Sequence, residues 1–128
     1  MKLEITTPER LLVSTDADSV QVPGKAGYLG ILPGHAPLVS ELRPGTIEYS
    51  AGNRAERLAV SWGYVEVLPD RVSVLAESAE KAEEIDLSRA ESSRKRAEER
   101  IKTAKDVDLE RAMLSLDRSL ARIQAAKK

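Results

Sequence analysis

The spacing of apolar residues changes once along the chain, near residue 85. Before that point, apolar and polar positions alternate in runs of about four to six residues, and Pro, Gly and Asn separate the runs, as is typical of half-buried β-strands. Beyond it, apolar or small residues recur every three or four positions, as on one face of a helix. We therefore expect a β-domain over residues 1–84 and a helical domain over residues 85–128.

The turn spacing of the first domain predicts about eight to ten short strands in an antiparallel sandwich or barrel. Pro69-Asp70, between two alternating runs, indicates a tight hairpin. Leu58, Val60 and Trp62 share one face of a run and are expected to be buried, while Trp62-Gly63 indicates a bulge or a sharp bend. Because the chain has no Phe and one Trp, the core must consist mainly of Val, Leu, Ile and Ala.

The second domain predicts two helices. Asp86 is suited to cap the first one, whose narrow stripe of apolar or small positions includes one arginine: Leu87, Ala90, Arg94, Ala97, Ile101 and Ala104. The pattern breaks near residues 105–108, where Asp106 or Asp108 is a candidate cap for the second helix and Val107 a candidate staple. That helix is expected to bury Leu109, Ala112, Met113, Leu116, Leu120 and Ile123. The short connection predicts antiparallel neighbours.

The first helix has alanines where leucines would be expected, so its apolar stripe is weak. Two helices by themselves cannot bury enough surface to fold stably. The hairpin must therefore lean on the sandwich or on a partner. We infer that it can leave either one, because a marginally packed element is a movable one.

Charge divides the chain at the same boundary. Residues 1–84 carry 8 basic and 13 acidic side chains, a balance of −5, whereas residues 85–128 carry 12 basic and 8 acidic side chains, a balance of +4. A positive arm on a negative body favours an acidic partner for the arm, although a solvated helical face would have the same composition. The overall net charge of −1 gives no reason to expect nucleic acid.

Cysteine and membrane signals are both missing from the sequence. With no Cys there is no disulfide framework and no thiolate metal site, and we expect no metal. The N-terminal residues lack the apolar core of a signal peptide and the pattern of a transit segment. No apolar run approaches the roughly 18 residues that cross a bilayer, so we expect any membrane association to run through other proteins.

Neither His35 nor the glycines of residues 24–30 predict catalysis. His35 is the one histidine, and no neighbouring pattern offers it a nucleophile, an orienting acid or further metal ligands. A structural or contact role is therefore expected. The glycines precede strand-like residues and Pro33, whereas phosphate-binding loops precede a helix. They are expected to make turns.

Four arginines of the helical domain are candidates for an anion site. Arg89 and Arg96 share a face of the first helix, and Arg118 and Arg122 stack on the second. If those faces meet, the guanidinium groups converge near Asp86, where a polyphosphate would satisfy them and Glu80 and Asp86 could accept from a base amine. The alternative stays open that these arginines pair with acids, namely Glu91, Glu99 or Asp117, or face water.

Three stretches carry a resemblance to a known family. Residues 27–38 read Gly-Tyr-Leu-Gly-Ile-Leu-Pro-Gly-His-Ala-Pro-Leu, residues 72–77 read Val-Ser-Val-Leu-Ala-Glu, and residues 85–90 read Ile-Asp-Leu-Ser-Arg-Ala. Along its full length the chain resembles the epsilon subunit of bacterial F-type ATP synthases. The resemblance implies a ten-stranded antiparallel β-sandwich (residues 1–84) followed by an antiparallel two-helix hairpin (residues 85–128).

The same resemblance implies a non-catalytic rotor subunit that joins the gamma subunit of the central stalk to the c-ring. Its hairpin would fold onto the sandwich or extend into the alpha/beta headpiece, where it inhibits ATP hydrolysis. The subunit would lie peripherally on the cytoplasmic side of the cell membrane, as part of the complex. In some members ATP binds the folded hairpin and favours the non-inhibitory form.

Individual positions follow from the resemblance. Residues 85–90 match the family's nucleotide box, which reads Ile/Leu-Asp-any-any-Arg-Ala. This match implies ATP binding by the residues of the box and by the surrounding arginines and acid: Ile85, Asp86, Arg89, Ala90, Arg96, Arg118, Arg122 and Glu80. Tyr28 and His35 would contact the c-ring and gamma. Many members have an acidic residue where Tyr28 stands, so an ion pair to the ring is not expected from that position.

Other functions remain as alternatives at this stage. A purely structural rotor adaptor would have the same fold but no response to nucleotide. A small hydrolase or isomerase would use His35, and a generic sandwich-plus-hairpin binding module would be unrelated to the synthase. Neither the enzyme nor the generic binding module explains both the loop at Pro33-Gly34-His35 and the nucleotide box at residues 85–90.

Overall fold

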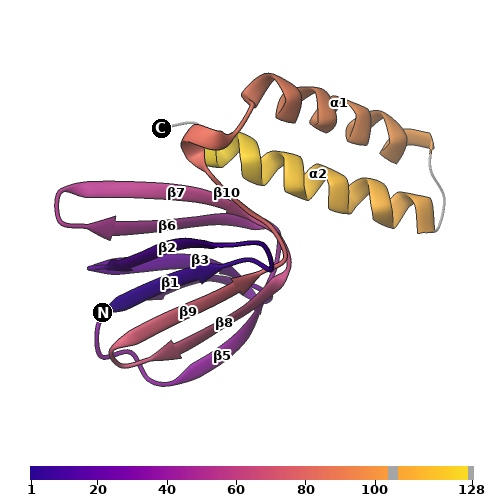
Figure 1. Cartoon of the computed structure of the whole chain (residues 1–128). Coiled ribbons are helices and arrows are strands. Elements are labelled where there is room, and N and C mark those ends of the chain that lie inside the picture. The colour runs from indigo at the N-terminus through magenta and orange to yellow at the C-terminus, as the bar shows by residue number, and fades with distance from the viewer. Residues whose placement is uncertain (104–106, 127–128) are drawn as a thin grey trace.

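The computed structural model describes residues 1–103 and 107–126. Within these ranges it contains ten strands, a short 3₁₀ turn and two helices, which confirms the predicted fold class (Figure 1). The elements are β1 (Lys2–Thr6), β2 (Leu11–Asp16), β3 (Ser19–Gly24), β4 (Gly27–Ile31), β5 (Leu38–Leu42), β6 (Gly45–Ala51), β7 (Arg54–Val60), β8 (Gly63–Leu68), β9 (Arg71–Ala76), β10 (Ala79–Lys81), η1 (Ala82–Glu84), α1 (Leu87–Thr103) and α2 (Val107–Ala126).

The strands form one sheet that curves back on itself around the core. Its order is β10-β7-β6-β3-β5-β8-β9-β1-β2, with β4 paired to β3. The pairings among the described residues are antiparallel except that between β1 and β9, which is parallel. Strand β1 therefore lies between β2 and β9. Its pairing with β9 joins the start of the β-domain to a strand near the end of that domain.

Small aliphatic side chains fill the interior, as the composition requires. In β1 and β9 the alternation places Leu3, Ile5, Val72 and Val74 in the core with no more than 1% exposure. Such side chains are β-branched or γ-branched, and they pack well on a pleated surface. The predicted burial of Trp62 is wrong: its side chain is 39% exposed, because the chain leaves β7 at Val60 and turns before β8 begins.

The bend predicted at Trp62-Gly63 is present, and Gly63 explains it. A Cβ atom on Gly63 would overlap the carbonyl oxygen of Leu75, and it would stand 2.9 Å from the Cα atom of Ala76. The backbones of β8 and β9 thus approach each other more closely than a side chain would allow. This close approach lets β8 start immediately after the turn and pair with β9 along its whole length.

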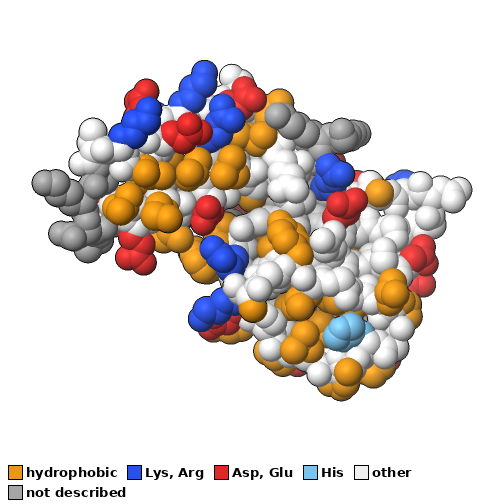
Figure 2. Space-filling model, turned by 180° about the vertical axis from the view of Figure 1, so that it is seen from behind, with side chains coloured by type: hydrophobic (Ala, Val, Ile, Leu, Met, Phe, Trp, Pro, Cys, Tyr) orange, Lys and Arg blue, Asp and Glu red, His pale blue; other side chains and the backbone are white. Residues whose placement is uncertain are grey.

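The helices form the predicted hairpin, which extends away from one end of the sandwich (Figure 1). Ala90 and Ala97 of α1 and Ala112 and Ile123 of α2 are buried. The expected burial of two other α2 residues is wrong, because Met113 is 52% and Leu120 is 44% exposed. Figure 2 shows apolar side chains that follow the hairpin between charged ones.

At the start of α2, Asp108 lies inside the helix, so it is not the cap. The alternative cap Asp106, the stripe residue Ala104 and the side chain of Val107 fall outside the described residues.

We expect Gly63→Ala to lower the free energy of unfolding by about 3 kcal/mol, the upper part of the usual range for overpacking, because backbone atoms must move to admit the methyl group. Urea unfolding followed by the fluorescence of Trp62 measures the change. Gly30→Ala is the matched control, since a Cβ atom there meets nothing within 4 Å. Equal midpoints for the two variants would contradict the role of the close approach.

Candidate functional site

Asp86 caps α1, as the sequence predicts. Its Oδ1 atom accepts a hydrogen bond of 3.1 Å from the backbone N–H of Arg89, and its backbone oxygen accepts one from the N–H of Ala90. The cap uses Oδ1, and a carboxylate has a second oxygen that can accept from other donors. The start of α1 is therefore held by local hydrogen bonds. The side chains of Asp86 and Arg89 are both exposed to solvent.

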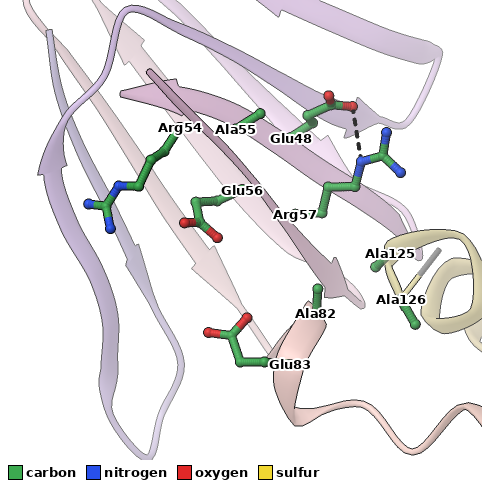
Figure 3. Close-up of a pocket in the computed structure, with 9 residues that line it drawn as sticks. All are labelled: Glu48, Arg54, Ala55, Glu56, Arg57, Ala82, Glu83, Ala125 and Ala126. Carbon is green, nitrogen blue, oxygen red and sulfur yellow. Dashed lines mark ion pairs between the residues drawn. The ribbon is translucent and has the colours of Figure 1, made fainter. Parts of the chain in front are cut away.

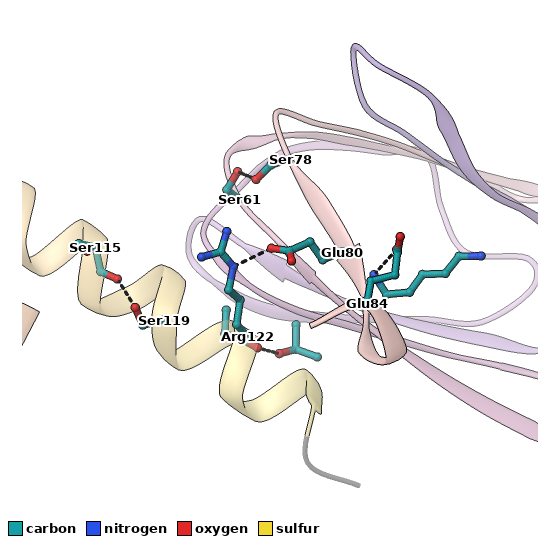
Figure 4. A network of polar contacts seen from close by, with 10 residues as sticks. Ser61, Ser78, Glu80, Glu84, Ser115, Ser119 and Arg122 are labelled. Atoms are coloured by element: carbon teal, nitrogen blue, oxygen red, sulfur yellow. Dashed lines mark hydrogen bonds and ion pairs between the residues drawn. The ribbon is translucent and has the colours of Figure 1, made fainter. Parts of the chain in front are cut away.

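A hollow of about 290 Å³ lies beside this cap. The end of β10, the turn η1, the start of α1 and the last turns of α2 supply its lining: Glu80, Glu84, Asp86, Arg89, Ala90 and Arg122. Across it, the Nε atom of Arg122 donates to Oε1 of Glu80 at 2.6 Å (Figure 4). Five of the predicted nucleotide-binding residues thus surround one hollow, and this ion pair ties α2 to β10.

Two of the four candidate arginines do not reach the hollow. Arg96 lies further along α1 and donates from Nη2 to the hydroxyl of Ser93 at 3.1 Å. Arg118 is exposed on α2 and has no ion pair within the described ranges. Arg122 pairs with Glu80 instead of the acids suggested by spacing alone. The structure therefore brings two guanidinium groups to Asp86, those of Arg89 and Arg122.

Ile85 has a different environment from the rest of the box. It is half-buried and packs against a small cluster of alanines formed by Ala59 of β7 with Ala121 and Ala125 of α2. Beside them, the hydroxyl of Thr46 donates to the backbone oxygen of Ala121 at 3.2 Å in a buried position. We call Ala59, Ala121, Ala125 and Thr46 the docking contact, because these residues join α2 to β6 and β7.

Sequence reasoning missed Glu84. Its carboxylate accepts from Nη2 of Arg10 at 2.8 Å and from the backbone N–H of Lys81 at 3.0 Å. The bond from Arg10, followed by that from Lys81, holds the pKa of Glu84 below its usual value of 4.5. The spacing from Lys81 to Glu84 is that of a capping box and could have indicated the second bond. No local pattern indicates the first, because Arg10 lies 74 residues away.

The charges that line the hollow bear on what it can bind. Three carboxylates face two guanidinium groups, so the formal balance is −1. An anion would meet a favourable field only after Glu80 releases Arg122. The volume lies near the lower limit of roughly 300 Å³ for small-molecule pockets. Binding of a triphosphate would therefore require local rearrangement of the Glu80–Arg122 pair.

A larger hollow of about 560 Å³ lies beside the end of α2 (Figure 3). Strands β6 and β7, η1 and the last residues of α2 line it. Its charged side chains have mixed signs, and Glu48 and Arg57 within it form an ion pair at 3.6 Å. It contains none of the predicted site residues.

Tyr28 and His35, the predicted contact residues, lie toward opposite ends of β4. Tyr28 is 49% exposed near the start of the strand, and its hydroxyl accepts from the backbone N–H of Thr46 at 3.1 Å. His35 lies in the loop after the strand, where the N–H of Gly34 donates to the oxygen of Pro69 at 2.7 Å. The structure thus anchors the two residues to different parts of the sandwich.

Two family models match the chain. The first, described as "ATP synthase, Delta/Epsilon chain, beta-sandwich domain", covers residues 1–82, and the second, described as "ATP synthase, Delta/Epsilon chain, long alpha-helix domain", covers residues 83–127. This chain belongs to the ATP synthase epsilon chain family. The resemblance inferred from the sequence is confirmed.

Curated epsilon chains support the assignment. That of Koribacter versatilis is 54% identical over 102 residues, which are 80% of this chain and 72% of the relative. That of Desulfosudis oleivorans is 48% identical over 104 residues, 80% of this chain and 78% of the relative. An epsilon subunit is a component of the central stalk of the synthase, so this chain is a stalk subunit of a membrane-associated complex.

Solved structures agree with the epsilon fold. A chain from the mitochondrial ATP synthase of Euglena gracilis aligns with a TM-score of 0.85 at 21% identity, over 98% of this chain and 80% of that chain. A chain from the central stalk and c-ring structure of the Tetrahymena thermophila enzyme aligns with a TM-score of 0.70 at 14% identity, over 99% and 96%. In the described part of this epsilon chain, neither helix is long and apolar enough to cross a membrane.

We expect Arg10→Gln to raise the pKa of Glu84 toward 4.5, because it removes the hydrogen bond that lowers this pKa most. A lowered carboxyl pKa contributes stability above pH 4.5, and this contribution is lost as the pH falls through the folded-state value. The variant should therefore lose less stability than the wild type on acidification below that pH. An NMR titration of the Glu84 carboxyl carbon measures the shift.

Arg71→Gln is the matched control for this titration, because Arg71 pairs with Glu4 and not with Glu84. It should leave the titration of Glu84 unchanged. A Glu84 titration curve that is the same in Arg10→Gln and in the wild type would reject the assigned cause.

Proposed function

We propose that the sandwich of this subunit binds the gamma subunit and the c-ring, and that its hairpin can leave the sandwich for the alpha/beta headpiece and restrain ATP hydrolysis there. The subunit itself carries out no catalysis. It would be held at the cytoplasmic face of the cell membrane through the complex. The observation that carries this proposal is the small contact by which α2 is held on β6 and β7.

The strength of the docking contact supports a movable arm. Burial of three alanine methyl groups contributes roughly 2 kcal/mol, at about 0.8 kcal/mol each. The Thr46–Ala121 hydrogen bond adds about 1 kcal/mol. Outside the docking contact, the Glu80–Arg122 pair, whose side chains are 35% and 40% exposed, adds at most about 1 kcal/mol after screening by solvent. A shift of a two-state equilibrium from 1:99 to 99:1 takes about 5.5 kcal/mol of differential binding. A protein surface that binds the released hairpin with this preference can therefore displace a contact of this size.

The charge of the hairpin supports an acidic partner. Residues 85–128 have a balance of +4, and Arg118 and Lys95 are among the cations exposed along the two helices. Opposite charge on a partner would steer the arm and fix its orientation more than it would raise the affinity. Met113 and Leu120 add exposed apolar surface that a protein partner could cover.

The outer face of the sandwich supports a second protein contact. In the register of β8, β9, β1 and β2, Tyr64 pairs with Leu75, Leu75 with Thr6, and Thr6 with Leu11. The Tyr64, Leu75 and Leu11 side chains are exposed in that row. An apolar row of this kind suits the surface of a stalk partner better than open water.

We further propose ATP as a regulatory ligand of the hollow beside Asp86. The phosphates would be bound by Arg89 and by Arg122 once Glu80 has released it. ATP bound there would touch α1, α2 and β10 together, so it would stabilise the docked hairpin by its differential affinity for that state. A purely structural adaptor, the alternative, would have the same fold without this response.

A disulfide across the docking contact tests the movable arm. Since the chain has no native Cys, Ala59→Cys with Ala121→Cys introduces a single pair within one buried cluster. In the assembled synthase, oxidation should hold the hairpin on the sandwich and raise ATP hydrolysis at least twofold over the reduced enzyme. Reduction should reverse the effect, and mass spectrometry verifies the cross-link.

Ala59→Cys alone, treated with the same oxidant, should not change the rate and serves as the control. Equal hydrolysis rates with and without a verified cross-link would reject the inhibitory arm. They would leave the stalk assignment in place.

Calorimetric titration of the isolated chain with ATP tests the nucleotide site. Arg89→Ala should weaken ATP binding at least tenfold, because it removes charge-assisted hydrogen bonds worth roughly 1.5–3 kcal/mol. Arg96→Ala removes the same charge from the same helix outside the hollow, and it should change the affinity by less than about twofold. The absence of saturable heat at millimolar ATP would reject this part of the proposal.

A further inference from the structure

Three residues from three separate elements form a continuous polar connection between β4 and the hairpin. The hydroxyl of Tyr28 on β4 accepts from the backbone N–H of Thr46 on β6 at 3.1 Å. The side-chain hydroxyl of the same Thr46 donates to the backbone oxygen of Ala121 on α2 at 3.2 Å. One buried residue, 6% exposed, therefore binds a half-exposed tyrosine with its backbone and the hairpin with its side chain.

The tyrosine occupies a place that the sheet leaves open. The ladder between β3 and β6 pairs Gln21 with Glu48, and it does not continue to Thr46. The strand β3 presents Pro23 at this end, which packs beside Gly45. The N–H of Thr46 would thus lie buried without an acceptor if the Tyr28 hydroxyl were removed, and a buried unsatisfied donor is costly.

Gly45 makes this arrangement possible. A Cβ atom on Gly45 would stand 2.5 Å from the Cβ atom of Pro23 and 3.0 Å from the hydroxyl oxygen of Tyr28. The absence of a side chain allows the phenol to reach the backbone of the next residue. The position of Tyr28 is therefore fixed by close packing as well as by its hydrogen bond, so a displacement of its ring must be felt at Thr46.

We propose that Tyr28 is a positioning residue for the hairpin: its hydroxyl fixes Thr46, and Thr46 in turn holds α2 through Ala121. A protein surface that draws the exposed ring of Tyr28 away from Gly45 loosens the docked hairpin, so occupancy of this end of the sandwich is communicated to the arm. The identity of that surface as a rotor partner rests on the proposed function. The hydrogen-bonded connection from Tyr28 through Thr46 to Ala121 does not depend on the proposed function.

Hydrogen exchange of the isolated full-length chain tests the connection without any partner. Tyr28→Phe removes the acceptor and keeps the ring. It should accelerate exchange of the α2 amides of residues 121–126 roughly threefold to tenfold, as expected for the loss of about one buried hydrogen bond. Thr46→Val, which removes the bond to Ala121 and keeps the branched shape, should accelerate the same amides at least as much.

The double variant separates a connection from two independent effects. If Tyr28 acts through Thr46, Tyr28→Phe with Thr46→Val should exchange no faster in α2 than Thr46→Val alone. Tyr64→Phe is the matched control, because the Tyr64 hydroxyl has no hydrogen bond to the described residues, and it should leave α2 exchange unchanged. The amides of Val65 and Val74 report whether the core is intact.

Three results would overturn the proposal. The first is that the α2 amides of Tyr28→Phe exchange at the wild-type rate. The second is a double variant whose acceleration equals the product of the single effects. The third is equal acceleration in α2 and in the core amides, which would indicate global destabilisation. None of them bears on ATP hydrolysis by the assembled synthase, so failure here is distinct from failure of the inhibitory arm.

Discussion

The docking of α2 on β6 and β7 depends on the smallness of the side chains between them. Ala59, Ala121 and Ala125 let the helix approach the sheet closely enough for the Thr46 hydroxyl to reach a helix carbonyl. Larger side chains would bury more area and would also hold the two domains further apart. The same three alanines thus permit a specific contact and limit its strength, and the proposed movement of the hairpin depends on that compromise.

The sandwich has the opposite character. Its core consists of tightly interlocked Val, Leu and Ile side chains, and the parallel pairing of β1 with β9 joins the first strand of the chain to one near the end of the β-domain. Interiors packed at native density transmit displacement from one side chain to the next. A large aliphatic core and a hairpin held by a small contact therefore coexist in one short chain.

The sequence was a good guide wherever the deciding contacts are local. Asp86 caps α1 because its acceptor and the Arg89 N–H lie three residues apart. The bend at Gly63 follows from a residue type with no side chain. Alternation alone misplaces Trp62, because a turn resets which face a side chain occupies.

Contacts between elements were harder to anticipate. Spacing put Arg118 and Arg122 on one face of α2, but it could not specify which of them the rotation and tilt of α2 would bring to β10. The pairing of Arg10 with Glu84 depends on the path of the whole sheet. The exposure of Met113 and Leu120 is of the same kind, since the side of α2 that is covered depends on how the helix packs against its neighbours.

The alanine cluster has a consequence for how the hold on the arm can be tuned. Each alanine contributes a single methyl group, so substitutions at these positions alter the apolar part of the contact only in coarse steps. Finer adjustment can come from the rim, where Glu80 and Arg122 face each other with a third or more of their side chains in solvent. Salt weakens an ion pair that is exposed to this extent. In the proposed function, the balance between the docked and the released hairpin should consequently depend on the salt concentration.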